Sequence, residues 1–272
     1  IGGVAGLGMI VGPGMGGFFA SGSIGYLGTV LLAGSISTIT LFFIVRYVKE
    51  SLPPERRRTE SNTQWWVHFR IVHRLKTLDE VPVVKYALWL KWLFTILMSI
   101  YVSTIALFVI DLFEFTEREL GIFMLMVGGF LSFNQLVVVR RILLKWGAIK
   151  SLQFGLGLAS VGFILITQTQ SIWVYAGFYY ILNLGIAMCL PSFNTIFAEH
   201  AKRENMGETM GISNGLMSLS NAMVPVIAAW TYSLIGHQIY WISSACALGG
   251  VFFVFLRLQP SLHLKTDTTV IE

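Results

Sequence analysis

Residues 8–17 read Gly-Met-Ile-Val-Gly-Pro-Gly-Met-Gly-Gly, and they place six helix-breaking residues inside an uncharged apolar run. Gly8, Gly12 and Gly16 recur every four residues, so they line one helix face and let a second helix approach closely in lipid. Pro13 removes one backbone hydrogen bond and bends the helix, which membranes accept where neighbouring helices cover the freed carbonyl. The segment therefore predicts a membrane span that serves either as a packing face or as a gating element of a transporter.

The composition places the rest of the chain in a membrane as well. Hydrophobic residues make up 55% of the 272 residues and charged residues only 12%, whereas soluble domains carry about 25% charge. No charged residue precedes Arg46, and several later apolar runs reach the roughly 20 residues that a helix needs to cross a bilayer. Membrane β-barrels instead show segments of about ten residues with alternating polarity. The sequence thus predicts an all-α integral membrane protein.

Hydropathy and helix breaks together predict eight membrane spans, at residues 1–20, 26–48, 84–110, 120–139, 149–168, 172–194, 210–235 and 239–257. The connections on one side hold 17 of the 19 Lys and Arg residues; Arg118 lies on the other side, and Lys91 lies within the third span. Because cytoplasmic connections are rich in basic residues, we expect both ends of the chain to face the cytoplasm. The chain opens at Ile1 inside apolar sequence, so we expect it to be a piece of a longer protein.

A long connection separates the second span from the third. It begins with Glu50-Ser-Leu-Pro-Pro-Glu55 and three arginines, and further along Trp65, Trp66, Phe69 and Val72 fall on one helical face. This pattern predicts a helix that lies on the membrane surface. A partner-binding or regulatory segment is the alternative.

The opening motif resembles the antiporter motif in the fifth span of drug:proton antiporters of the major facilitator superfamily, where it serves as a kinked hinge and packing surface. The segment from Glu50 to Glu55 resembles the usual end of the sixth span in that family. Met206-Gly-x-x-x-Gly211 and the later Val224-Pro225 are similar to the entry and bend of the eleventh span.

The basic segment after the fourth predicted span also resembles that family. Arg140-Arg141-Ile-Leu-Leu-Lys145-Trp-Gly147 is similar to a degenerate cytoplasmic loop between the eighth and ninth spans, without the acidic residue and full glycine pattern of the complete motif. We expect Gly12, Pro13 and Gly16 to contact the neighbouring half of the protein at Gly128 and Gly129. The candidate packing and gating residues are therefore Gly8, Gly12, Pro13, Gly16, Gly17, Gly128, Gly129 and Pro225.

The resemblance implies a major facilitator fold in which this chain covers the fifth to twelfth spans. The last two spans of the N-terminal bundle would occupy 1–48, and the central cytoplasmic loop 49–83. The C-terminal six-span bundle would occupy 84–257, and a cytoplasmic tail 258–272. In this family, the spans that would precede residue 1 carry a basic gating loop, an arginine and often the carboxylate that takes up the proton.

Polar side chains within the spans are candidates for a substrate cavity, because they are costly in lipid and are usually functional. Two stripes follow helical spacing, one starting at Lys91 and one running from Gly207 to Pro225. The candidate cavity residues are Lys91, Thr95, Ser99, Asn134, Gln135, Tyr179, Asn183, Asn214, Ser218 and Asn221. Two alternatives stay open: Lys91 extends to the cytoplasmic surface, and the amides pair with neighbouring helices.

Acidic side chains gather at the outer end of the third span, namely Asp111, Glu114, Glu117 and Glu119. We expect a solvated rim there, with a proton site as the alternative.

For function, the resemblance implies a secondary transporter that exports small amphipathic or hydrophobic organic molecules by alternating access, driven by proton influx. We expect a multi-pass, monomeric protein of the bacterial cytoplasmic (inner) membrane, whose partners are its substrate, protons and the lipid bilayer, with no nucleic acid. The alternatives are an uptake carrier for a small metabolite and a non-transporting sensor or scaffold. The chain has no phosphate-binding loop and no catalytic constellation, and Cys189 and Cys246 lie in different apolar runs. We therefore expect no enzymatic activity, no cofactor and no metal.

Overall fold

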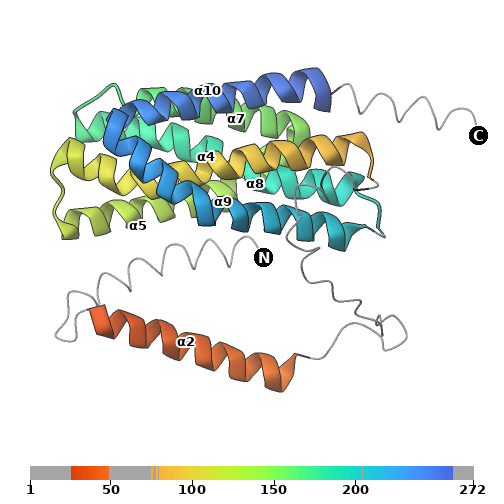
Figure 1. Ribbon diagram of the computed structural model, residues 1–272, viewed down its shortest axis with the longest axis horizontal. Coiled ribbons are helices and arrows are strands. Elements are labelled where there is room, and N and C mark those ends of the chain that lie inside the picture. Colours follow the sequence, from red (N-terminus) through yellow and green to blue (C-terminus); the bar gives the residue numbers. More distant parts are fainter. Residues whose placement is uncertain (1–25, 49–74, 76–77, 79, 204, 260–272) are drawn as a thin grey trace, which may run out of the picture.

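The computed structural model describes residues 26–48, 75, 78, 80–203 and 205–259, which form helices and, within these ranges, no strand (Figure 1). The α-helices are α2 (Tyr26–Tyr47), α4 (Pro82–Phe113), α5 (Glu117–Phe133), α6 (Arg140–Trp146), α7 (Ala148–Leu165), α8 (Ile172–His200), α9 (Met206–Ile235) and α10 (Ile239–Phe253). The shorter elements are the π-helical segments η3 (Asn134–Val139) and η5 (Val254–Leu258) and the 3-10 turn η4 (Gly236–Gln238).

The predicted spans from residue 26 onward are all found as helices, whereas the predicted span 1–20 lies outside the described residues. By length and apolar composition, six helical stretches suit a membrane crossing, and the last of them, Met206–Leu258, has 53 residues. A straight helix of that length would measure about 80 Å, more than twice the hydrocarbon core. Gly236, with a φ of +56°, divides this stretch into α9 and α10. Two separate spans are therefore found here, as the sequence predicted.

The basic segment after α5 corrects one expectation from the sequence. We expected Arg140 to Gly147 to form a loop, but η3 and α6 continue the helix to Trp146. Only at Gly147, with a φ of +76°, does the chain turn before α7. Arg, Leu and Lys are strong helix formers, so the helix continues beyond its apolar part until a glycine ends it. Arg140, Arg141 and Lys145 are thus exposed on a helix and not in a connection.

Local capping explains the tight turn between α4 and α5. Glu114 takes a left-handed conformation, with a φ of 52°, and ends α4. Thr116 and Glu119 then form a capping box: the Thr116 N–H donates to the Glu119 carboxylate at 2.9 Å, and the Glu119 N–H donates to Thr116 Oγ1 at 3.4 Å. This role at the start of α5 favours the rim interpretation for Glu119.

The closest packing in the bundle lies between α7 and α8. A Cβ added at Gly162 would lie 2.6 Å from Leu182 Cα, and one at Gly185 would lie 2.5 Å from the Ala159 nitrogen. Only glycine fits at such positions, which suits a membrane bundle whose helices associate through packing rather than through the hydrophobic effect.

Buried serines join α7 to α10. The Ser244 hydroxyl donates to the Ser160 carbonyl at 2.8 Å, and the two hydroxyls lie 2.9 Å apart. Because lipid offers no hydrogen-bond partner, such paired hydroxyls help to hold helices together.

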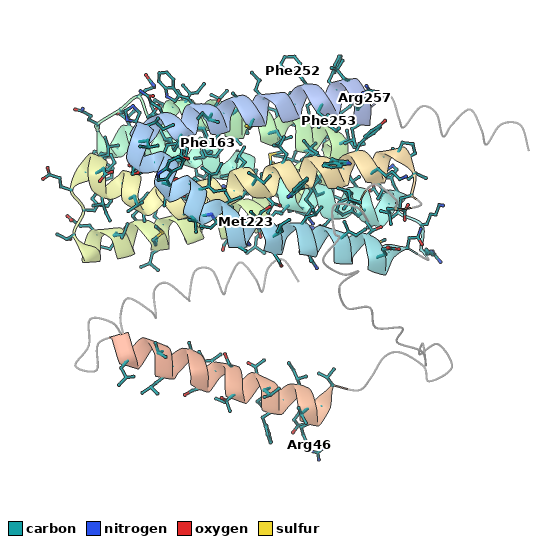
Figure 2. All side chains as sticks on the ribbon, in the orientation of Figure 1. Arg46, Phe163, Met223, Phe252, Phe253 and Arg257 are labelled. Carbon is teal, nitrogen blue, oxygen red and sulfur yellow. The ribbon has the colours of Figure 1, made fainter. Side chains whose placement is uncertain are left out.

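Aromatic and apolar side chains distinguish the inside of the bundle from its periphery. Phe163 is fully buried among the helices, whereas Phe252 points outward and is 58% exposed (Figure 2). Large exposed apolar side chains of this kind are what a lipid-facing surface requires.

Helix α2 lies apart from the bundle of α4 to α10 (Figure 1). Its large apolar side chains are exposed, among them Val45 at 78%. The Thr38 and Thr40 hydroxyls donate to carbonyls four residues earlier, so these polar groups are satisfied within the helix. The assignment of residues 1–48 to an N-terminal bundle stays a prediction.

Candidate functional site

Helices α4 and α9 run side by side in the same direction (Figure 1). Ser99 Oγ donates to Asn221 Oδ1 at 3.1 Å, and the Tyr232 hydroxyl donates to Asp111 Oδ2 at 2.8 Å. The partners in the first pair are 122 residues apart in the sequence, and those in the second pair are 121 apart. The two helices therefore keep one register over about three turns. The bond at Asp111 also gives this carboxylate a structural partner near the C-terminal end of α4.

The polar stripe predicted on α9 lies on a face of the bundle that no other described helix covers. Asn214, Ser218 and Asn221 are all exposed, and Pro225 is half-buried. Amide side chains are costly against lipid and are normally turned toward protein or a water-filled cavity. This face therefore suits contact with another part of a larger protein or with an aqueous cavity.

The stripe predicted on α4 is buried. Lys91, Thr95 and Ser99 are 8%, 8% and 6% exposed. Thr95 Oγ1 donates to the Lys91 carbonyl at 2.8 Å, so this hydroxyl is satisfied by its own helix. Within this stripe, Ser99 reaches the α9 stripe through Asn221, and Lys91 reaches α8.

Lys91 is held by two side chains of α8 that the sequence did not indicate. Its Nζ donates to Asn194 Oδ1 over a long 3.5 Å and lies 5.2 Å from the centre of the Phe197 ring. Such a cation–π contact stabilises a desolvated ammonium. Phe197 lies one turn before the end of α8, so the lysine does point toward that end, but its side chain stays covered.

Two other cavity candidates pair with each other inside the bundle. Asn134 is fully buried and donates to Asn183 Oδ1 at 3.2 Å, while the Tyr180 hydroxyl donates to Asn134 Oδ1 at 3.0 Å. Asn183 also donates to the Val127 carbonyl at 3.4 Å. This network joins α5, η3 and α8, and it favours the helix-pairing alternative for Asn134 and Asn183. Gln135, the next residue, is half-buried.

Tyr179 is also internal. It is fully buried, its hydroxyl pairs with that of Tyr101, and its ring packs edge-on against Phe123. Because these aromatic contacts close the middle of the bundle, Tyr179 is placed as a core residue rather than on the open face.

The structure describes only some of the candidate packing and gating residues. Residues 8–17 lie outside the described residues. Gly128 is buried, and a Cβ at Gly129 would meet nothing within 4 Å in the part of the chain that the structure describes. The expected contact between these two glycines and the first motif stays a prediction.

The last part of the central connection is tied to the turn between α8 and α9. Leu75 and Leu78 are buried in the core, and Glu80 is 6% exposed. The Lys202 backbone N–H donates to both oxygens of the Glu80 carboxylate, at 3.1 and 3.2 Å. Nothing in the sequence pattern indicated this contact. The surface helix predicted around Trp65 lies outside the described residues.

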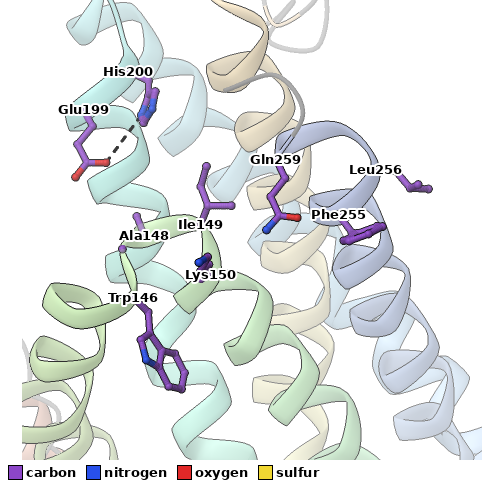
Figure 3. Close-up of a pocket in the computed structure, with 10 residues that line it drawn as sticks. Trp146, Ala148, Ile149, Lys150, Glu199, His200, Phe255, Leu256 and Gln259 are labelled. Carbon is purple, nitrogen blue, oxygen red and sulfur yellow. Dashed lines mark ion pairs between the residues drawn. The ribbon is translucent and has the colours of Figure 1, made fainter. Parts of the chain in front are cut away.

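A hollow of about 820 Å³ opens where α6, α7, α8 and η5 meet (Figure 3). Trp146, Lys150 and Phe255 line it. Glu199 and His200 lie at its upper edge in Figure 3, with Glu199 Oε2 4.0 Å from His200 Nδ1. A neighbouring hollow of about 430 Å³ is lined by Gln135 and other residues of η3, α6 and α8. Both hollows lie at the basic ends of the helices, away from the stripe on α9.

The helical bundle and its polar face agree with the comparison to known families. A family model described as Major Facilitator Superfamily matches residues 1–225. The chain belongs to the major facilitator superfamily. It is therefore a multi-pass integral membrane protein, as the composition and the long apolar helices indicated.

Two major facilitator relatives show how much of such a protein the chain spans. It is 24% identical to the tetracycline resistance protein, class H, of Pasteurella multocida, over 98% of this chain and 65% of that protein. The structure of the human organic anion transporter MFSD10 (TETRAN) superposes with a TM-score of 0.77 at 22% identity, over 93% of this chain and 62% of that one. The chain thus spans somewhat less than two thirds of each, and the structural match confirms the major facilitator fold.

Proposed function

We propose that this chain is part of a secondary transporter that exports small amphipathic or hydrophobic organic molecules by alternating access, with proton influx as the driving force. The observation that carries the proposal is the uncovered polar face of α9, in register with α4, on a bundle whose periphery is apolar. Such a face suits the wall of a cavity between two bundles that opens alternately to either side. Family membership indicates a transporter rather than an enzyme.

The names of the relatives support the substrate class. One is a tetracycline resistance protein and the other an organic anion transporter, so both names refer to small organic molecules. Within the described structure, the α9 stripe offers amides and a hydroxyl, and Met223 beside it is 56% exposed (Figure 2). A wall of this composition suits an uncharged or amphipathic surface.

The proposed placement is a bacterial cytoplasmic membrane, with the protein as a monomer and the basic helix ends inside. Arg46 and Arg257 both lie toward the right of Figure 2, at the ends of α2 and η5. Helices α5 and α8 run toward the same end as η5 (Figure 1). Lys145 comes after α5 in the chain, and Lys202 comes after α8. The positive-inside rule supports a cytoplasmic position for that end.

Transport by the intact protein in proteoliposomes tests the proposal. We expect a pH gradient to drive tetracycline or an amphipathic dye against its concentration gradient, and a protonophore to abolish this movement. Asn214→Leu and Asn221→Leu should slow transport, whereas the matched lipid-facing replacement Phe252→Leu should leave it unchanged. Movement that persists after the gradient is collapsed rejects proton coupling, and gradient-driven accumulation in the import direction supports an uptake carrier. No movement of any substrate supports a sensor or scaffold.

A further inference from the structure

Lys91 is a buried cation whose partners do not neutralise it. Its side chain contacts an amide oxygen of Asn194 and the ring of Phe197, and it is 8% exposed. In the part of the chain that the structure describes, no carboxylate lies within 4.0 Å of its ammonium. A buried charge without a counter-ion is costly, so a binding partner of opposite charge would be strongly favoured here.

The register between α4 and α9 places two further hydroxyl groups at about the level of this lysine along the bundle. Ser99 pairs with Asn221, 122 residues later, and the same offset sets Ser213 level with Lys91. Thr209 lies one turn before Ser213 on the same face, and α9 packs mainly against α4. Both residues are buried, Thr209 fully and Ser213 at 4% exposure.

These two hydroxyls, like that of Tyr175 elsewhere in the core, differ from most buried hydroxyls of the described helices. Ser220 on α9, like Thr95 on α4, donates to the carbonyl four residues earlier. Thr209 Oγ1 and Ser213 Oγ are buried and have no hydrogen-bond partner among the described residues. A buried hydroxyl without a partner is costly. The two hydroxyls at the level of the buried ammonium are therefore donors that lack an acceptor within the described protein.

We propose that Lys91, Thr209 and Ser213 bind the carboxylate of an organic monoanion, which makes such molecules a substrate class of the transporter. The ammonium supplies the charge, and the hydroxyls donate to the carboxylate oxygens. Asn194, exposed on α8 beside the ammonium, marks the side from which the carboxylate enters. The Phe197 ring also covers the ammonium, and Phe197 itself is fully buried in the apolar core of the bundle. This inference rests on the proposed transport function, but it concerns binding and is tested by binding.

The test uses the intact protein in lipid nanodiscs and matched pairs of probes. The carboxylates acetate, octanoate and 1-naphthoate are compared at constant ionic strength with acetamide, octanamide and 1-naphthamide, by the rise in melting temperature with ligand concentration. We expect at least one carboxylate to bind about 10- to 100-fold more tightly than its amide, the range for a hydrogen bond to a charged group. A protein that is stabilised no more by the carboxylates than by the amides overturns the proposal.

Variants connect this preference to the site. Lys91→Met should remove the carboxylate preference while amide binding is kept, and Lys91→Arg should retain most of it. Lys85→Met, on the same helix, is the matched control and should behave like the wild type. If Lys91→Met does not fold, the double variant Thr209→Val/Ser213→Ala, which keeps the lysine, should still weaken carboxylate binding several-fold. A preference that survives these substitutions overturns the assignment.

The results also separate this inference from the proposed function. Carboxylate-selective binding without any transport would leave the site standing and reject the transporter. Gradient-driven transport of a neutral or cationic substrate, together with no carboxylate preference, would support the transporter and reject the carboxylate site.

Discussion

Gly162 on α7 lies directly against the backbone of Leu182 on α8, so closely that a Cβ at 162 would lie 2.6 Å from Leu182 Cα. We predict that Gly162→Ala forces the two helices apart and destabilises the bundle by about 1–3 kcal/mol, the usual cost of overpacking. Thermal unfolding of the intact protein in detergent measures this loss.

Gly157 provides the matched control on the same helix. A Cβ there would meet no atom of the described protein within 4 Å, so Gly157→Ala should unfold at or slightly above the wild-type temperature, because alanine favours the helix. Equal melting temperatures for the two alanine variants would contradict the close contact between α7 and α8.

The pair Asn134 and Asn183 leads to a prediction that separates packing from substrate binding. Asn183→Leu leaves the buried Asn134 amide without its acceptor and should cost about 1–3 kcal/mol of stability. The double variant Asn134→Leu/Asn183→Leu should regain part of this loss, because fewer unpaired amides remain. Transport assays should show an unchanged KM for Asn183→Leu in the protein that stays folded.

Asn214→Leu is the comparison for that experiment. Since Asn214 is exposed on the α9 stripe, its replacement should leave stability nearly unchanged and impair transport. If Asn183→Leu raised KM and Asn214→Leu did not, the cavity would lie within the α5–α8 interface and not on the α9 face.

The contact between Glu80 and Lys202 predicts a local effect on the central connection. Glu80→Ala removes the acceptor at 3.1 Å, so the Lys202 backbone amide should exchange with solvent deuterium faster, by roughly 5- to 30-fold for 1–2 kcal/mol. Hydrogen exchange with mass spectrometry on the peptide that joins α8 to α9 measures this. Glu199→Ala, at an exposed site nearby, should leave the same peptide unchanged; equal effects of both variants would show a general loosening of that end.

The glycine motif at residues 8–17 gives a prediction about movement. Gly12→Leu and Gly16→Leu should impair turnover more than substrate binding, because bulky side chains on that face would hinder the sliding of one helix past another. Gly34→Leu on α2 serves as a control, since a Cβ there would meet none of the described residues within 4 Å. Wild-type turnover in both motif variants would leave the segment with a packing role alone.

The sequence predicted most of the helices because glycine and polar residues interrupt long apolar runs. It failed at Arg140 to Trp146, where charge suggested a loop but helix propensity carried the chain onward. The spacing of polar residues predicted both stripes, but it did not predict that the α4 stripe is buried and the α9 stripe exposed. Whether Asn134 meets Asn183, or Lys91 meets Phe197, depends on how distant helices rotate toward each other. The glycines at 155, 162 and 185 were missed for the same reason, because each becomes special only beside its partner helix.

The π-helical segment Asn134–Val139 has a consequence for related chains that differ in length. A wider turn accommodates one additional residue, so every side chain after it is rotated by about 100° relative to an uninterrupted α-helix. The directions of Arg140 and Arg141 therefore depend on this wider segment. A relative with a one-residue deletion here should keep the same span but present its basic cluster to a different neighbour, which makes this position a natural place for divergence within the family.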